Sequence, residues 1–221
     1  VAASGEVTAS SSGHVQIASS NSGVAGTSGR LVFSSGSSSA SNAGCVSLGS
    51  DAATAGAGGA VSVVVGSGTS GLGGSLAMTS GRSTIGSGGA VVLDSGEGTA
   101  TSSGAVCLFT ANSGTSGTSG RLSFSSGVSN AGNSGIVYLA AGSATAGRGG
   151  LVTITLGSGT SGAGGRIDID SGRSTVHTGG CVCFSAGEGT ATSSGAARLR
   201  SANSGTDGTS GMLVVSSGSA T

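Results

Sequence analysis

The stretch AVVLDSGEGTATSSG (residues 90–104) contains the pattern that organises the whole chain. It starts with alternating apolar residues, Val91 and Leu93, and continues with small polar residues and glycines. The decapeptide GEGTATSSGA, which overlaps its second half, occurs at 96–105 and again at 187–196. A looser copy, GEVTASSSGH, lies at 5–14, so the copies are 91 residues apart. Recurrence at a fixed spacing indicates a tandem-repeat protein.

The 91-residue unit consists of six shorter repeats. A glycine closes each short repeat, and these glycines are spaced by 15 residues ten times and by 16 residues three times. Positions two and four after each closing glycine are apolar, which is the period-two pattern of a β-strand. Glycine at position seven and at the end of the repeat predicts turns, because glycine adopts a positive φ without steric cost. The closing glycines are Gly13, Gly29, Gly44, Gly59, Gly74, Gly89, Gly104, Gly120, Gly135, Gly150, Gly165, Gly180, Gly195 and Gly211.

This pattern predicts an all-β fold, a parallel β-solenoid (β-helix) of about fourteen coils of 15–16 residues with a six-coil super-repeat. Positions two, four and eleven would face the core, with position eleven on a short return strand. Residues 1–221 would form one continuous solenoid, with super-repeats at 14–104 and 105–195 and partial ones at both ends. We expect the chain to be a fragment of a longer repeat protein. The competing prediction is a disordered Gly/Ser polymer, which the regular placement of the apolar residues opposes.

Composition excludes several classes of function. The chain has 221 residues, of which 48 are glycine, and its formal net charge is zero. A neutral chain offers no electrostatic basis for binding nucleic acid or an anionic membrane. No apolar run approaches the roughly 18–20 residues of a membrane span, so no membrane insertion is expected.

The solenoid would present an apolar stripe on its outer face, at positions one, three and five. A long apolar stripe is rare on a soluble monomer and indicates packing against another molecule. Unpaired coil ends would in addition allow head-to-tail stacking. We therefore predict homo-oligomeric self-association, lateral, head-to-tail or both. The candidate lateral contacts are Val32, Val64, Val92, Cys107, Phe109, Ile136, Tyr138, Leu151, Cys181 and Cys183.

Position ten of many repeats is threonine, which predicts an outer threonine column. At position eight, Arg82 and Glu97 occupy adjacent coils, as do Arg173 and Glu188, so each pair could form an ion pair along the rod. The threonines are Thr54, Thr69, Thr84, Thr99, Thr145, Thr160, Thr175 and Thr190. A regular threonine face would suit an ice-binding protein, although this column is interrupted and only one threonine wide.

Residues with catalytic or ligand-binding chemistry are few. Asp168 and Asp170 form the tightest acidic cluster and could bind a cation or act as an acid/base pair, but solvated or interface-facing charges are the favoured interpretation. His14 and His177 are expected at the surface. The four cysteines (Cys45, Cys107, Cys181, Cys183) match no zinc motif and are expected to be small apolar residues at a contact surface, or to bridge chains. We predict no enzyme activity, no cofactor and no metal; a uronate-cleaving enzyme is the weakest alternative.

The stretch GGAVVLDSGEGTATSSGAVCLF (89–109) resembles the Ser/Gly-rich tandem repeats of very large surface or secreted proteins of algae and other aquatic microbes. The resemblance covers the whole chain and implies an extracellular or cell-surface location, with a structural or adhesive use. The leading hypothesis is a structural protein that builds an extracellular fibre or surface appendage by coil stacking and lateral rod packing. The alternative is a binding module, either ice-binding or an adhesin stalk.

Overall fold

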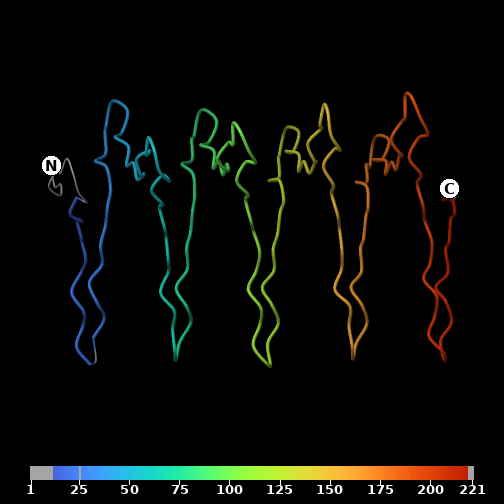
Figure 1. Cartoon of the computed structure of the whole chain (residues 1–221), viewed down its shortest axis with the longest axis horizontal. Helices are drawn as coiled ribbons and strands as arrows, with labels where there is room; N and C mark the ends of the chain where they lie inside the picture. Colours follow the sequence, from blue (N-terminus) through green and yellow to red (C-terminus); the bar gives the residue numbers. More distant parts are fainter. Residues whose placement is uncertain (1–11, 25, 219–221) are drawn as a thin grey trace. The chain divides into compact units, whose positions relative to one another are not determined.

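A computed structural model describes residues 12–24 and 26–218. Over these residues the backbone forms no α-helix and no β-strand, and it runs as a plain trace in Figure 1. The predicted parallel β-solenoid of about fourteen coils is therefore wrong, because no ladder of hydrogen bonds joins successive repeats in this part of the chain. The Cα positions form two units, Val1–Leu108 and Phe109–Thr221, and the same local structure recurs within each.

Each 15-residue repeat consists of an extended segment followed by a loop. In eight repeats the N–H of the closing glycine, at position fifteen, donates to the carbonyl oxygen of position seven, with N···O distances of 2.9–3.5 Å. Gly104 N–H to Gly96 O is one of these bonds, at 2.9 Å. Within the loop the chain bends at positions ten to twelve. The bend thus lies where a short return strand was predicted, and not at position seven or the closing glycine, where turns were predicted.

The closing glycine lies against the side chain of position six. A Cβ placed on Gly150 would lie 2.8 Å from the Cβ of Ala141, and one on Gly74 would lie 2.5 Å from the Cγ1 of Val65. Separations under 3.0 Å are essentially never seen for real Cβ atoms, so Gly74 and Gly150 accept no side chain unless the loop moves, and the same holds for Gly59 at 2.9 Å. At the other closing glycines from residue 29 to residue 211 the Cβ would lie 3.1–3.7 Å from the side chain of position six. Val65, at 39% exposed, is the least exposed of the large apolar side chains in the described ranges.

In three of the described repeats, serine at position six adds a hydrogen bond to this contact. The Ser35 hydroxyl donates to the carbonyl oxygen of Gly44 at 2.8 Å, and the Ser50 hydroxyl donates to that of Gly59 at 2.7 Å. The 16-residue repeat that begins at residue 14 has the same bond, from the Ser19 hydroxyl to the Gly29 carbonyl at 2.8 Å. The extra residue of that repeat is therefore accommodated without loss of the contact that closes the loop.

The 15-residue loops differ in the residue at position nine. Where it is serine, the hydroxyl oxygen accepts a backbone N–H three residues later: Ser83 from Gly86 at 2.9 Å and Ser174 from His177 at 2.8 Å. Such a bond stabilises the turn locally. Where it is glycine the backbone itself crowds the site, since a Cβ on Gly189 would lie 2.5 Å from the carbonyl oxygen of Ser193.

The glycines serve a different purpose from the one that we predicted. No residue in the described ranges, glycine included, has a positive φ. The prediction that glycine is needed to reach the left-handed region of φ is therefore wrong. Glycine is needed instead because a neighbouring side chain or carbonyl lies too close for a Cβ, as at Gly150 and Gly189.

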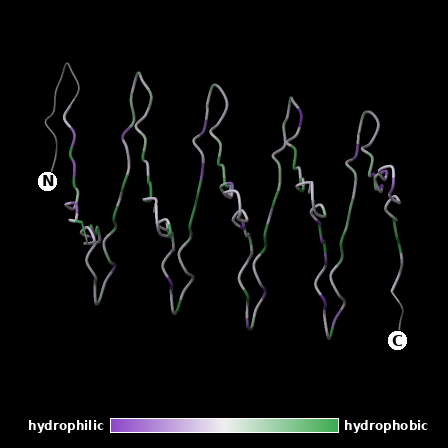
Figure 2. Cartoon of the chain, turned by 90° about the horizontal axis from the view of Figure 1, so that it is seen from below, coloured by the Kyte–Doolittle hydropathy of each residue, from purple (hydrophilic) through white to green (hydrophobic). Residues whose placement is uncertain are grey.

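The described residues form no hydrophobic core. None of them is buried, and the accessible surface of the chain is 21,471 Å², whereas a folded protein of 20.0 kDa exposes roughly 8,700 Å². Figure 2 shows hydrophobic residues spread along the extended segments. Large apolar residues at position two are 43–60% exposed, against 59–88% for the apolar residues at positions one, three and five. Apolar residues at position four, which were also expected to face inward, are 55–87% exposed, so only position two is shielded more than the outward positions and no interior forms.

Position eleven was expected to face inward, and this expectation is also wrong. Ile85 is 101% exposed and Val176 is 81% exposed, because both lie in the bend of their loop. A residue in the bend has no opposing segment to contact.

The composition of the repeat explains why the lone chain does not collapse. Glycine loses more conformational freedom on ordering than any other residue, and there are 48 glycines. Each repeat offers only two or three large apolar side chains against this entropy cost, and aromatic residues make up 2% of the chain. Local loop contacts can therefore form while a shared interior does not.

We predict that Gly150→Ala opens its loop, because the added Cβ would displace Ala141 and break the hydrogen bond from residue 150 to the Gly142 carbonyl, which is 2.9 Å long. The temperature dependence of the amide-proton shift of residue 150, measured by NMR, should rise to that of a solvent-exposed amide. The matched control is Gly149→Ala, whose Cβ would meet nothing closer than 3.9 Å. Equal effects of the two substitutions would contradict the contact described for the closing glycine.

Candidate functional site

The acidic cluster contains one ion pair. Arg166 donates from Nη2 to Oδ2 of Asp168 at 2.8 Å, and the two side chains are 82% and 56% exposed. Residues two apart on an extended segment face the same side, which brings these two together. Asp170 has no ion-pair partner among residues 12–24 and 26–218. Water screens such an exposed pair, so it contributes little to stability.

The ion pairs predicted between neighbouring repeats are not formed among the described residues. Arg82 does not contact Glu97, and Arg173 does not contact Glu188, since Arg166–Asp168 is the ion pair that this part of the chain contains. The prediction depended on coils stacked in register, and that stacking is absent. The described residues also include no group of three or more His, Cys, Asp or Glu side chains that could hold a metal ion.

We predict that Asp168→Asn releases the Arg166 guanidinium, which should be visible as a shift of its Nε–Hε resonance. Asp170→Asn is the matched control and should leave that resonance in place. Because the pair is exposed, about 0.5 M NaCl should release it as well in the unmodified chain. An Arg166 resonance that moves equally in both variants would show that the pair does not form.

The candidate lateral contacts are all exposed. Phe109, Ile136, Tyr138 and Leu151 are each more than four-fifths exposed, and Val32, Val64 and Val92 also face solvent. Cys107, Cys181 and Cys183 are exposed and free. The lone chain thus leaves these residues available, and their role in lateral contacts stays a prediction.

The position-ten threonines share one place in the repeat. Each is exposed and begins the three-residue bend of its loop. They are Thr54, Thr69, Thr84, Thr99, Thr145, Thr160, Thr175 and Thr190. Their alignment in one outer column was inferred from stacked coils, and it stays a prediction.

The two cysteines of the Cys181-Val182-Cys183 segment have adjacent sulfur atoms. The thiol of Cys183 donates to the Sγ of Cys181 at 3.5 Å, and both cysteines are free and exposed. Cys45 and Cys107 are free and exposed as well. The sequence places Cys181 and Cys183 on one side of an extended segment, but only the structure shows how close the sulfur atoms come.

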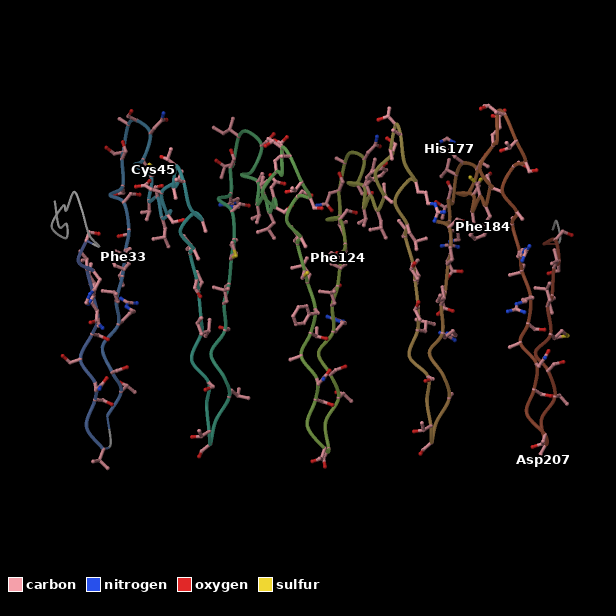
Figure 3. The ribbon with its side chains drawn as sticks, in the orientation of Figure 1. Phe33, Cys45, Phe124, His177, Phe184 and Asp207 are labelled. Atoms are coloured by element: carbon pink, nitrogen blue, oxygen red, sulfur yellow. The ribbon has the colours of Figure 1, made fainter. Side chains whose placement is uncertain are left out.

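The histidines do not take part in a catalytic arrangement in the described part of the chain. His14 is exposed, and the backbone N–H of His177 is bonded to the hydroxyl of Ser174 within its loop. Asp207 lies in the turn of a 16-residue repeat, at the tip of a loop in Figure 3.

Open hollows lie between the extended segments of successive repeats in the second unit. The larger has a volume of about 650 Å³ and is lined by residues 183–186 and 196–199. A smaller one of about 290 Å³ is lined by Phe124 and residues 137–139. Phe184 and Leu199 occupy position four of successive repeats, where sequence reasoning expected a filled core. The alternation did signal these apolar side chains, but it could not show that the space between them is open.

Comparisons with known proteins identify no relative: no protein-family model, no curated protein and no solved structure matches the chain. A search of the described residues for a helix long and apolar enough to cross a membrane found none. The assignment of function therefore depends on the repeat, its loops and its exposed apolar side chains.

Proposed function

We propose that this chain is a repetitive structural protein whose repeats self-associate, building a fibre or surface appendage outside the cell. One observation supports this proposal most strongly: no described apolar side chain is buried within the chain. Apolar side chains left in water favour association, at about 25 cal/mol per Å² of apolar area removed from contact with solvent. A repeat that presents them at regular intervals provides many equivalent contacts along one chain.

The placement of the apolar residues favours contacts between chains. Large apolar side chains at positions one, three and five of the extended segments, such as Ile136 and Tyr138, are 59–88% exposed. The open hollow beside Phe184 and Leu199 has room for apolar side chains of a second copy. Because the net charge is zero, no long-range repulsion between copies opposes this approach.

The loops suit a structural role for a different reason. They are closed by short-range contacts between positions six, seven and fifteen, which recur in repeat after repeat. Each repeat can therefore keep its local shape in the absence of a core, and it presents its extended segment in the same way as its neighbours. An extracellular location is supported by the resemblance to Ser/Gly-rich surface proteins described above.

We predict that replacing Phe109, Ile136, Tyr138 and Leu151 together by serine raises the protein concentration needed for association at least ~10-fold. Each substitution removes roughly 1–2 kcal/mol of burial free energy per contact. Sedimentation velocity over a concentration series measures the onset of assembly. The matched control replaces Thr99, Thr145, Thr160 and Thr190 by serine, which changes four exposed loop residues and removes little apolar surface.

The two variants distinguish self-association through the extended segments from other modes. If the control weakens association as much as the apolar variant does, the loops and not the extended segments form the contacts. If the unmodified chain remains a monomer at all concentrations, the proposed function is wrong. Labelling of intact cells of the producing organism with an antibody tests the location independently.

A further inference from the structure

The Cys181–Cys183 pair has a feature that the other repeats lack. It places two thiols at positions one and three of one extended segment, with their sulfur atoms 3.5 Å apart. Cys107 occupies position three of an earlier repeat, but position one there is Ala105. Cys45 lies at position one of its repeat with Ser47 at position three. Only one repeat therefore provides a dithiol, and the two single cysteines are natural controls for it.

The sulfur separation matches the bite of a tetrahedral metal ion. A Zn–S bond is about 2.3 Å long, so two thiolates bound at a tetrahedral angle lie roughly 3.8 Å apart. The observed distance of 3.5 Å requires only a small movement to reach that geometry. Both thiols are exposed, so an ion can reach them without any opening of the chain.

One chain can fill only half of the coordination shell. Structural zinc sites have four protein ligands, and the described residues include no third His, Cys, Asp or Glu in reach of the pair. A second copy of the chain offers the same two thiolates on an equally exposed segment. Two such pairs form a closed Cys₄ shell.

We propose that the Cys181–Cys183 dithiol chelates a thiophilic divalent cation such as Zn²⁺, and that the dithiol of a second copy completes the site. Four thiols each lose a proton as one ion binds, so the complex carries a charge of −2 and four protons are released. Binding therefore weakens as the pH falls, because protons compete with the metal for the thiolates. The inference goes beyond the proposed function and does not rest on it, since metal binding and metal-free association are measured separately.

The test uses the reduced full chain at a concentration where it is a monomer in a chelator. Addition of Zn²⁺ should double the sedimenting mass with one ion bound per two chains, and excess chelator should reverse the change. Co²⁺ in place of Zn²⁺ should give the thiolate-to-metal absorption and the visible bands of a tetrahedral tetrathiolate site. The double variant Cys181→Ser/Cys183→Ser should lose all of these signals.

The matched control is Cys45→Ser/Cys107→Ser, which removes the same number of thiols and should bind metal as the unmodified chain does. Metal binding that persists without Cys181 and Cys183, or that disappears with Cys45 and Cys107, would overturn the assignment. A complex of one ion with one chain, without a change in mass, would overturn the bridging by a second copy.

Discussion

The contact between position six and the closing glycine determines the local structure of every 15-residue loop that contains it. The side chain of position six occupies the space where a Cβ of the closing glycine would lie, as with Ala141 at Gly150. The same approach allows the glycine N–H to reach the carbonyl of position seven. Serine at position six adds a second bond in some repeats, for example from Ser50 to Gly59. At Gly59, Gly74 and Gly150, glycine is thus a steric requirement set by a residue nine positions earlier.

The length and boundaries of the repeat could be predicted from the sequence, but whether neighbouring repeats pack against one another could not. Glycine spacing gave the length of the repeat, but the bend lies at positions ten to twelve and not at the glycines, and the Val91–Leu93 alternation predicted a β-strand where the structure has an unpaired segment. An alternation of apolar and polar residues indicates which side chains share a face, but it does not indicate whether another segment covers that face. The solenoid required neighbouring repeats to pair, and in the lone chain the cost of ordering a glycine-rich backbone outweighs the burial of a few aliphatic side chains. The predicted ion pair between Arg82 and Glu97 was wrong for the same reason, because it also required neighbouring repeats to stack.

Some site features were accessible to sequence reasoning in principle. Small residues at position six, such as Ala141 and Ser50, accompany the glycine at position fifteen, and this pairing is the signal of the close contact. The shared side of Cys181 and Cys183 follows from their spacing, whereas their sulfur separation depends on the rotamers that the structure provides. The hollow beside Phe184 could not be predicted, since the same pattern is compatible with a filled interior.

The central claim is that the lone chain keeps its loops while its extended segments remain unpaired and free to contact other copies. Amide hydrogen exchange of the dilute monomer, resolved residue by residue by NMR, tests this claim most directly. The account predicts measurable slowing at closing glycines such as Gly89, Gly104 and Gly180, with exchange at positions one to five close to that of an unstructured peptide. Slow exchange throughout positions one to five of successive repeats would show paired strands in the monomer and would contradict the account.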